Sequence, residues 1–243
     1  KIYLKILKYL IFAVVIVALT LFVESYFTDK SPQETCNVMG IKLRGDLITY
    51  IPNTDYDDKG NISEDETSSD KIVLSIGDAN ADKKIKAIIL EIDSVGGSPV
   101  AAEEIANALK QTKKPTVALI RESGNSAAYW VATGANTIFA SKNSDVGSIG
   151  VSMSYLDNSK KNQKEGLNYT QLISGKFKDM GSSDKPLTAE EKNLLMRDIK
   201  ILHQNFVKAV AENRKLDIKK VEALADGSSM LCEMALKNGL IDK

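Results

Sequence analysis

The amino-acid sequence predicts an α/β domain whose strands are mainly parallel. Apolar runs with the length of buried strands recur along the chain, and stretches with helical periodicity separate them. Hydrophobic residues make up 43% of the 243-residue chain and charged residues 26%, which is the balance of an ordinary globular protein. Because a chain of this length can bury one substantial core, we expect one main domain.

The amino-terminal segment is directed to a membrane. Residues Tyr9 to Val23 are apolar except for Thr20, and three lysines precede them. This length suits a signal-peptide core almost as well as a span, but no small-residue cleavage site follows. Lysines favour the cytoplasmic side. We therefore expect residues 1–27 to be an uncleaved single-pass anchor in the cell membrane, with the rest of the chain outside the cytoplasm.

The folded part follows a polar connection. Residues 28–39 are interpreted as a stalk, and residues 40–243 as the domain, whose first strand-like stretch covers residues 40–52. Between residues 55 and 70, seven acidic residues stand against one lysine. So charged a segment rarely buries enough apolar surface to become ordered, and it predicts a solvated surface loop.

Alternation of strand and helix begins at residue 86. Residues 86–93 form an apolar run typical of a buried strand, and Ser98 with Pro99 opens a helix as N-cap and first-turn proline. Thr188 and Glu191 form a capping box before a long amphipathic helix. The remaining elements are predicted strands at 115–120, 137–141, 147–151 and 168–173, a short helix at 126–133 and the long helix at 189–215.

Composition excludes several classes of function. The 32 basic and 32 acidic residues cancel, so no global field attracts nucleic acid. Cys36 and Cys232 are too few for a disulfide framework and have no metal-ligand spacing. The single histidine, His203, lies in the long helix, where such a residue is more often structural or solvated than catalytic. We expect no metal, no organic cofactor and no Ser-His-Asp triad.

Two glycine-bearing turns follow predicted buried strands. The first contains Gly96 and Gly97, and the second ends at Ser126. Ligands bind at the carboxyl ends of strands in an open α/β sheet, and glycines there can offer backbone N–H groups to an anion. Glycines also serve simple tight turns, so the pattern by itself leaves both interpretations open.

Five ordered segments resemble the signal peptide peptidase A family of serine proteases, from about residue 40 to the end. Two of these are the turn Ser94-Val95-Gly96-Gly97 and the segment Asn125-Ser126-Ala127-Ala128-Tyr129. The most specific is Ser174-Gly175-Lys176-Phe177-Lys178-Asp179, similar to the segment that carries the family's general base. The other two are Gly147-Ser148-Ile149-Gly150-Val151 and the carboxyl-terminal pair Ala225-Asp226-Gly227 and Gly239-Leu240-Ile241-Asp242.

The resemblance implies a spiral of ββα units like that of caseinolytic proteases and crotonases. It implies that Ser126 is the nucleophile and Lys178 the general base of a serine endopeptidase acting on membrane-associated peptides such as cleaved signal peptides. Gly96, Gly97 and Ala127 would bind the oxyanion or substrate. The family's active sites are shared between subunits of a homo-oligomer, and the separation of 52 positions between Ser126 and Lys178 is long enough to allow this. Burial in an interface would favour a neutral lysine base.

The sequence also departs from the family pattern. Val95 stands in place of a proline, Ala127 and Ala128 in place of glycines, and Ser228 in place of an arginine. The two alanines leave open a catalytically inactive, membrane-tethered scaffold of the same fold. A crotonase-like thioester enzyme is a further alternative, but it gives no role to Ser126 and Lys178.

Overall fold

The computed structural model describes residues 16–20, 36–51 and 66–243. The chain divides into two compact units, Lys1–Cys36 and Asn37–Lys243. In the first unit, residues 16–20 are helical, and the rest of the predicted anchor lies outside the described residues. Within those ranges no helix is long and apolar enough to cross a membrane.

The second unit is built on a seven-stranded sheet. Its path is β2-β1-β3-β4-β6-β7, and β5 also pairs with β4. All the pairings are parallel except that of β6 with β7. The strands are β1 (Val38–Ile48), β2 (Glu66–Ser68), β3 (Ala87–Gly97), β4 (Thr116–Asn125), β5 (Thr137–Ala140), β6 (Asp145–Gly147) and β7 (Ser229–Leu231). The predicted α/β class with a mainly parallel sheet is confirmed.

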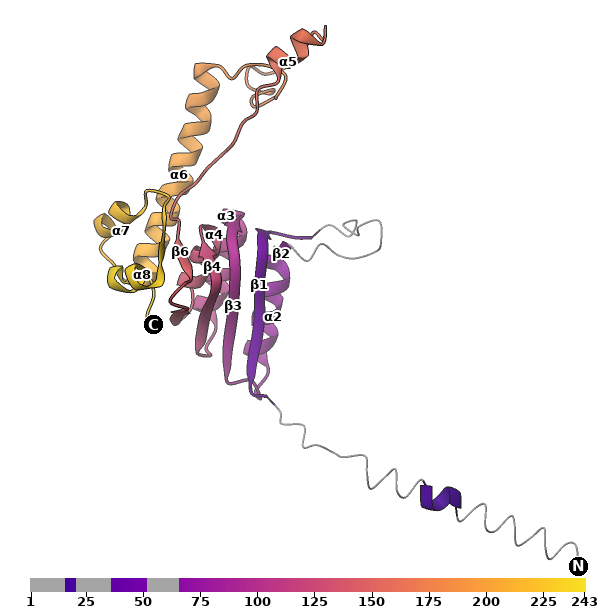
Figure 1. The fold of residues 1–243 in the computed structure, drawn as a ribbon, viewed down its shortest axis with the longest axis vertical. Coiled ribbons are helices and arrows are strands. Elements are labelled where there is room, and N and C mark those ends of the chain that lie inside the picture. The colour runs from indigo at the N-terminus through magenta and orange to yellow at the C-terminus, as the bar shows by residue number, and fades with distance from the viewer. Residues whose placement is uncertain (1–15, 21–35, 52–65) are drawn as a thin grey trace, which may run out of the picture. The chain divides into compact units, whose positions relative to one another are not determined.

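Three helices pack against this sheet. They are α2 (Ser69–Ala81), α3 (Pro99–Gln111) and α4 (Ala127–Thr133), and Figure 1 shows them together on one face. The core between these layers comes from alternate residues of the central strands, such as Leu43, Leu90 and Ile120, which are almost completely buried. All seven residues of α4 are buried, so the helix that follows β4 lies inside the domain.

Local signals mark the helix starts correctly. Ser98 caps α3 by accepting a hydrogen bond from the Ala101 N–H, with Pro99 as first helical residue. The capping box of Thr188 and Glu191 opens α6 (Ala189–Arg214).

Three predictions about secondary structure are wrong. Residues 168–173 are not a strand, and of the predicted strand at 147–151 only Gly147 belongs to one, at the end of β6. The acidic loop ends earlier than predicted, because residues 66–68 form β2 and α2 begins at Ser69. Here the Thr67 hydroxyl donates to the Arg44 carbonyl and accepts from the Arg44 N–H, which ties this polar stretch to β1. This tertiary contact therefore makes a strand of residues whose acidic composition predicts a loop.

Residues 154–188, here called the arm, leave the sheet. They include α5 (Ser159–Lys164), and Figure 1 shows α5 near the end of α6 that is remote from the sheet. The chain returns along α6, whose carboxyl-terminal half buries Phe206, Val207 and Val210. The helix α6 is therefore anchored in the domain at one end and carries the arm at the other.

The carboxyl terminus fastens α6 to the sheet. After α7 (Ile218–Leu224) and α8 (Cys232–Asn238), Asp242 accepts two hydrogen bonds from the Arg214 guanidinium, at 2.7 and 3.1 Å. It also accepts from the Ile138 N–H in β5 at 2.8 Å. Burial opposes ionisation of Asp242, but these donors and the Arg214 charge hold its pKa below the usual range.

Candidate active site

Ser126 lies in a sharp turn between β4 and α4. Its backbone φ of 51° is in the region that residues with a side chain rarely adopt. Its N–H donates to the Gly147 carbonyl at 2.8 Å, and its carbonyl accepts the Trp130 N–H at 3.0 Å. The turn is therefore held from β6 on one side and by α4 on the other. Its hydroxyl makes no capping hydrogen bond to the helix.

The glycine turn at the end of β3 packs directly against this serine. A Cβ added to Gly96 would lie 2.8 Å from the Ser126 Cβ and 3.1 Å from the Ala127 nitrogen. One added to Gly97 would lie 2.2 Å from the Leu47 carbonyl oxygen. Both glycines have φ above +120°. Only glycine fits these positions, and at Gly96 this allows the turn to approach Ser126 closely.

Hydrogen bonds hold the glycine turn in place. The Gly96 N–H donates to the Ser94 hydroxyl at 3.1 Å, and this hydroxyl donates to the Gly45 carbonyl at 2.6 Å. The Gly96 N–H is thus used in a hydrogen bond that holds the turn. Next along the chain, the Ser98 N–H donates to the Leu47 carbonyl at 2.6 Å, which fixes Gly97 against the end of β1.

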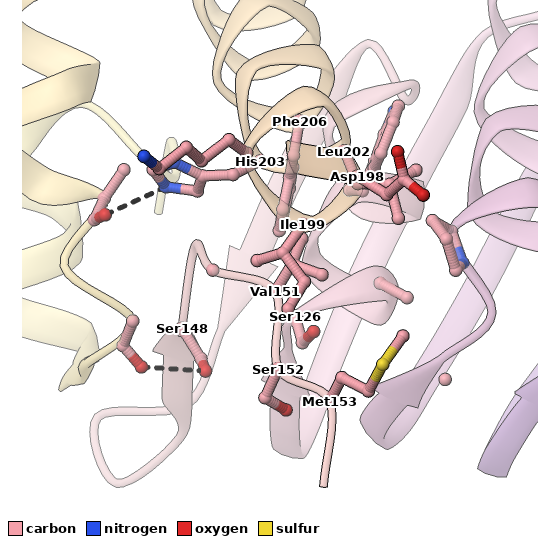
Figure 2. Close-up of a pocket in the computed structure, with 18 of the residues that line it drawn as sticks. Ser126, Ser148, Val151, Ser152, Met153, Asp198, Ile199, Leu202, His203 and Phe206 are labelled. Carbon is pink, nitrogen blue, oxygen red and sulfur yellow. Dashed lines mark hydrogen bonds between the residues drawn. The ribbon is translucent and has the colours of Figure 1, made fainter. Parts of the chain in front are cut away.

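A pocket of about 880 Å³ opens at Ser126. Figure 2 shows Ser126 between the segment carrying Val151 to Met153 and the residues of α6. Trp130 and Phe206 stack with ring centroids 5.0 Å apart and form part of its wall. The other large apolar lining residues are Val95, Val151, Met153, Met196, Ile199 and Leu202. The space beside the serine is therefore suited to an apolar side chain.

His203 lines the same pocket, which sequence reasoning did not anticipate. One ring nitrogen, Nε2, lies 3.0 Å from the Ala225 carbonyl oxygen and donates to it (Figure 2). A signal was present in the sequence, because residues three apart share a helix face and Phe206 is one of the buried residues of α6. Asp198, Lys200 and Asp226 also line the pocket and give it a polar side.

Of the residues that depart from the family pattern, Val95 and Ala127 line the pocket, whereas Ala128 and Ser228 do not. Ala128 is fully buried and absent from the pocket lining, so its methyl group belongs to the core. Ala127 is 4% exposed and lines the pocket. Ser228 accepts the Ser148 N–H with its carbonyl at 3.0 Å and so helps to hold the wall next to the serine turn.

Lys178 lies on the arm and does not reach the pocket of its own chain. Its side chain is exposed and is not part of the pocket wall, and its N–H donates to the Gly175 carbonyl at 2.9 Å. Nearby, the Tyr169 hydroxyl donates to the Asp179 carboxylate at 2.5 Å. The structure thus brings Ser126, Gly96, Gly97 and Ala127 together and leaves Lys178 apart from them.

An internal ion pair supports the base of the arm. Lys185 donates to the Glu191 carboxylate at 2.6 Å, and Glu191 also accepts from the N–H and hydroxyl of Thr188. The hydrogen bond from Lys185, followed by that from the Thr188 backbone, lowers the pKa of Glu191 to about 2. Glu191 in turn raises the pKa of Lys185. The arm therefore keeps a defined connection to α6.

The site can be compared with known proteins. The model of peptidase family S49 matches residues 108–243, more than half of the chain. The chain belongs to peptidase family S49. The resemblance to signal peptide peptidase A is thereby confirmed, and the matched residues include the serine turn, the arm and α6.

Individual relatives agree with this family. The chain is 38% identical over 170 residues to MJ0651 of Methanocaldococcus jannaschii, named as a protease, covering 69% of this chain and 55% of the relative. It is 30% identical over 184 residues to SppA of Enterococcus faecium, named as a signal peptide peptidase, covering 74% and 54%. The chloroplastic serine protease SPPA of Arabidopsis thaliana is 30% identical over 177 residues, covering 72% and 26%. The chain spans about half the length or less of these relatives.

Proposed function

We propose that this chain is a serine endopeptidase with Ser126 as nucleophile. The observation that carries the proposal is the packing of the Gly96-Gly97 turn against Ser126 at the mouth of the pocket. A strained turn that presents a hydroxyl beside exposed backbone donors is the geometry used for acyl transfer. The serine peptidases among its relatives support the same chemistry.

In the proposed reaction, the Ser126 Oγ attacks a peptide carbonyl carbon while its proton passes to a general base. The base then protonates the leaving amine as the C–N bond breaks, and water hydrolyses the acyl-enzyme. Successive N–H groups of an extended chain point to opposite sides, and the Ser98 N–H faces β1. We therefore assign the oxyanion to the Gly97 N–H, on the Ser126 side, together with the Ala127 N–H.

The base is Lys178 from a second copy of the chain. This assignment is supported by the exposure of Lys178 on an arm that leads away from its own Ser126. Apolar side chains of the arm are also exposed, among them Leu167 at 58% and Leu172 at 93%. Contact with a second copy would cover these groups, and a dry interface favours the neutral lysine that can accept a proton.

The substrates we propose are membrane-associated peptides with apolar side chains, such as cleaved signal peptides. The apolar wall formed by Trp130, Phe206 and Leu202 supports this choice, as does the name of the Enterococcus faecium relative. Residues 9–23 would anchor the enzyme in the cell membrane, with the domain outside the cytoplasm. A protease added to intact cells should then digest the domain although it cannot enter the cytoplasm. Protection of the domain from digestion would contradict this orientation.

The decisive experiment is complementation. Ser126→Ala and Lys178→Ala should each lower peptide hydrolysis by at least about 10²-fold, because each removes one member of the dyad. Lys176→Ala, on the same exposed turn, is the matched control and should retain activity. Mixing the two inactive proteins after dissociation should restore part of the activity, since some sites then combine an intact Ser126 with an intact Lys178. No recovery despite proven mixing would refute sharing between copies.

The same experiment separates the alternatives. An inactive scaffold predicts no hydrolysis by the unmutated protein and no effect of either substitution. A thioester enzyme predicts hydrolysis of acyl thioesters that persists in Ser126→Ala. The burial of the Ala128 methyl group in the core, away from the cleft, favours the active peptidase.

A further inference from the structure

Lysines gather on two loops at the amino ends of β3 and β4. The α2–β3 connection carries Lys83, Lys84 and Lys86, and the end of α3 with the α3–β4 connection carries Lys110, Lys113 and Lys114. The only acidic residue in residues 82–86 and 110–115 is Asp82. This surface, here called the lysine edge, is strongly basic although the whole chain has no net charge.

Hydrogen bonds join one loop to the start of β1 and the other to the end of α2. The Lys86 N–H donates to the Asn37 carbonyl at 2.6 Å, and the Lys113 N–H donates to the Asn80 side chain at 3.2 Å. The Lys114 ammonium donates to the carbonyls of Ala79 and Asp82 and so caps the end of α2. The lysine edge is thus one ordered surface, which begins where the chain enters the domain.

Several of these ammonium groups have no anionic partner in residues 16–20, 36–51 and 66–243. Lys110 pairs with Glu212 at 2.7 Å, and the Lys86 ammonium donates to the Lys83 carbonyl at 2.8 Å. Among the residues that the structure describes, Lys83, Lys84 and Lys113 are exposed and form no salt bridge. They are available to an external anion.

The carboxyl ends of β3 and β4 carry charges of both signs. Asp93 and Glu122 line a hollow of about 380 Å³ beside the Ser94-Val95 turn, together with Asp145 at the start of β6. In the same region, Arg44 and Arg121 pair with Glu91 at 2.9 and 3.3 Å. An anionic surface would therefore be attracted to the lysine edge, where positive charge predominates.

We propose that the lysine edge binds the anionic lipid headgroups of the membrane in which residues 9–23 are anchored, an inference that rests on the anchor of the proposed function. The 13 residues between Val23 and Asn37 reach at most about 50 Å, which limits how far the start of this edge can lie from the end of the anchor. Lysines close to an anionic bilayer each strengthen binding about fivefold. Because β4 has 10 residues, Ser126 lies about 30 Å from the lysine edge, at the other end of the strand.

The test is lysine labelling of the full chain in lipid nanodiscs. One set of discs contains phosphatidylcholine alone, and the other also contains about 30% phosphatidylglycerol, enough to give a negative surface. Lysine acetylation is followed at each position by mass spectrometry. Lys83, Lys84 and Lys113 should react at least about fivefold more slowly in the anionic discs, and high salt should remove the difference. Lys219 and Lys220 on α7 should react equally in both.

A charge-reversal variant separates contact from general lipid effects. One variant combines Lys83→Glu, Lys84→Glu and Lys113→Glu, and in it Lys86 should be acetylated at the same rate in the two kinds of disc. The matched variant combines Lys208→Glu, Lys219→Glu and Lys220→Glu, and it should keep the slower acetylation of Lys86 in the anionic discs. Equal labelling of the edge in both kinds of disc overturns the proposal. Slow labelling in both discs and in detergent also overturns it, because a protein segment then covers the edge. Failure of the chain to enter discs refutes the anchor and this proposal together, whereas entry without protection refutes this proposal alone.

Discussion

Substitution of Gly96 by alanine should disable the site through a single methyl group. The new Cβ would lie 2.8 Å from the Ser126 Cβ, whereas ordinary contacts begin at 3.4 Å, so the serine must move by about 0.6 Å. A shift of this order costs about 10- to 100-fold in kcat/KM, since about 1 Å costs 10²-fold. Alanine at a φ of +123°, together with the overpacking, should also lower the free energy of unfolding by roughly 2–5 kcal/mol.

The assay is peptide hydrolysis normalised to the folded fraction, which the fluorescence of the single tryptophan, Trp130, reports. Gly77→Ala is the matched control, because Gly77 lies in α2 with nothing within 4 Å of an added Cβ. It should leave kcat/KM unchanged and raise the free energy of unfolding by about 0.5–1 kcal/mol. If folded Gly96→Ala hydrolysed peptide as fast as the unmutated protein, the role of this contact in positioning Ser126 would be refuted.

Three further outcomes are expected. Trp130→Ala should lower the free energy of unfolding by about 3–5 kcal/mol, because it removes a buried ring stacked on Phe206, and a loss below about 1 kcal/mol in urea unfolding would contradict this. Asp242→Asn should cost about 2 kcal/mol in the same assay, since the nearly buried Arg214 loses its counter-charge, and equal midpoints would exclude such a contribution. Glu191→Gln should destabilise the arm only above the pH range in which Glu191 titrates. The folded pKa of about 2 lies below the unfolded value, so the carboxylate stabilises the native state above about pH 4, and this contribution disappears as pH falls towards 2. Urea midpoints of variant and unmutated protein should therefore converge between pH 5 and about pH 2, and a gap independent of pH would disprove the linkage.

Local chemistry made several parts of this protein predictable. Ser98 and Thr188 are helix caps because their side-chain oxygens satisfy N–H groups at a helix start, and this depends on neighbours three residues away. The core strands are similarly evident, since β3 and β4 contain runs of consecutive apolar residues. The places of the Gly96-Gly97 turn and of Ser126 were predictable for the same reason, as each directly follows such a strand.

Features that depend on distant residues were not predictable. β2 forms in an acidic stretch because Thr67 hydrogen-bonds Arg44, 23 residues earlier. His203 lies in the pocket because Phe206, on the same helix, stacks on Trp130 of α4. Residues 168–173 have the alternation of a strand but find no strand to pair with, so they remain irregular in the arm.

The sequence by itself determined the α/β class, the mainly parallel sheet, the family and the identity of the candidate nucleophile, because periodicity, capping residues and motifs are encoded within a few consecutive positions. Only the tertiary structure decided that Gly96 spends its N–H on Ser94, that Ala128 belongs to the core, and that Lys178 stands away from its own Ser126. These facts depend on how separate elements pack. Packing is set by the summed contacts of residues far apart in the chain, and no local pattern contains them.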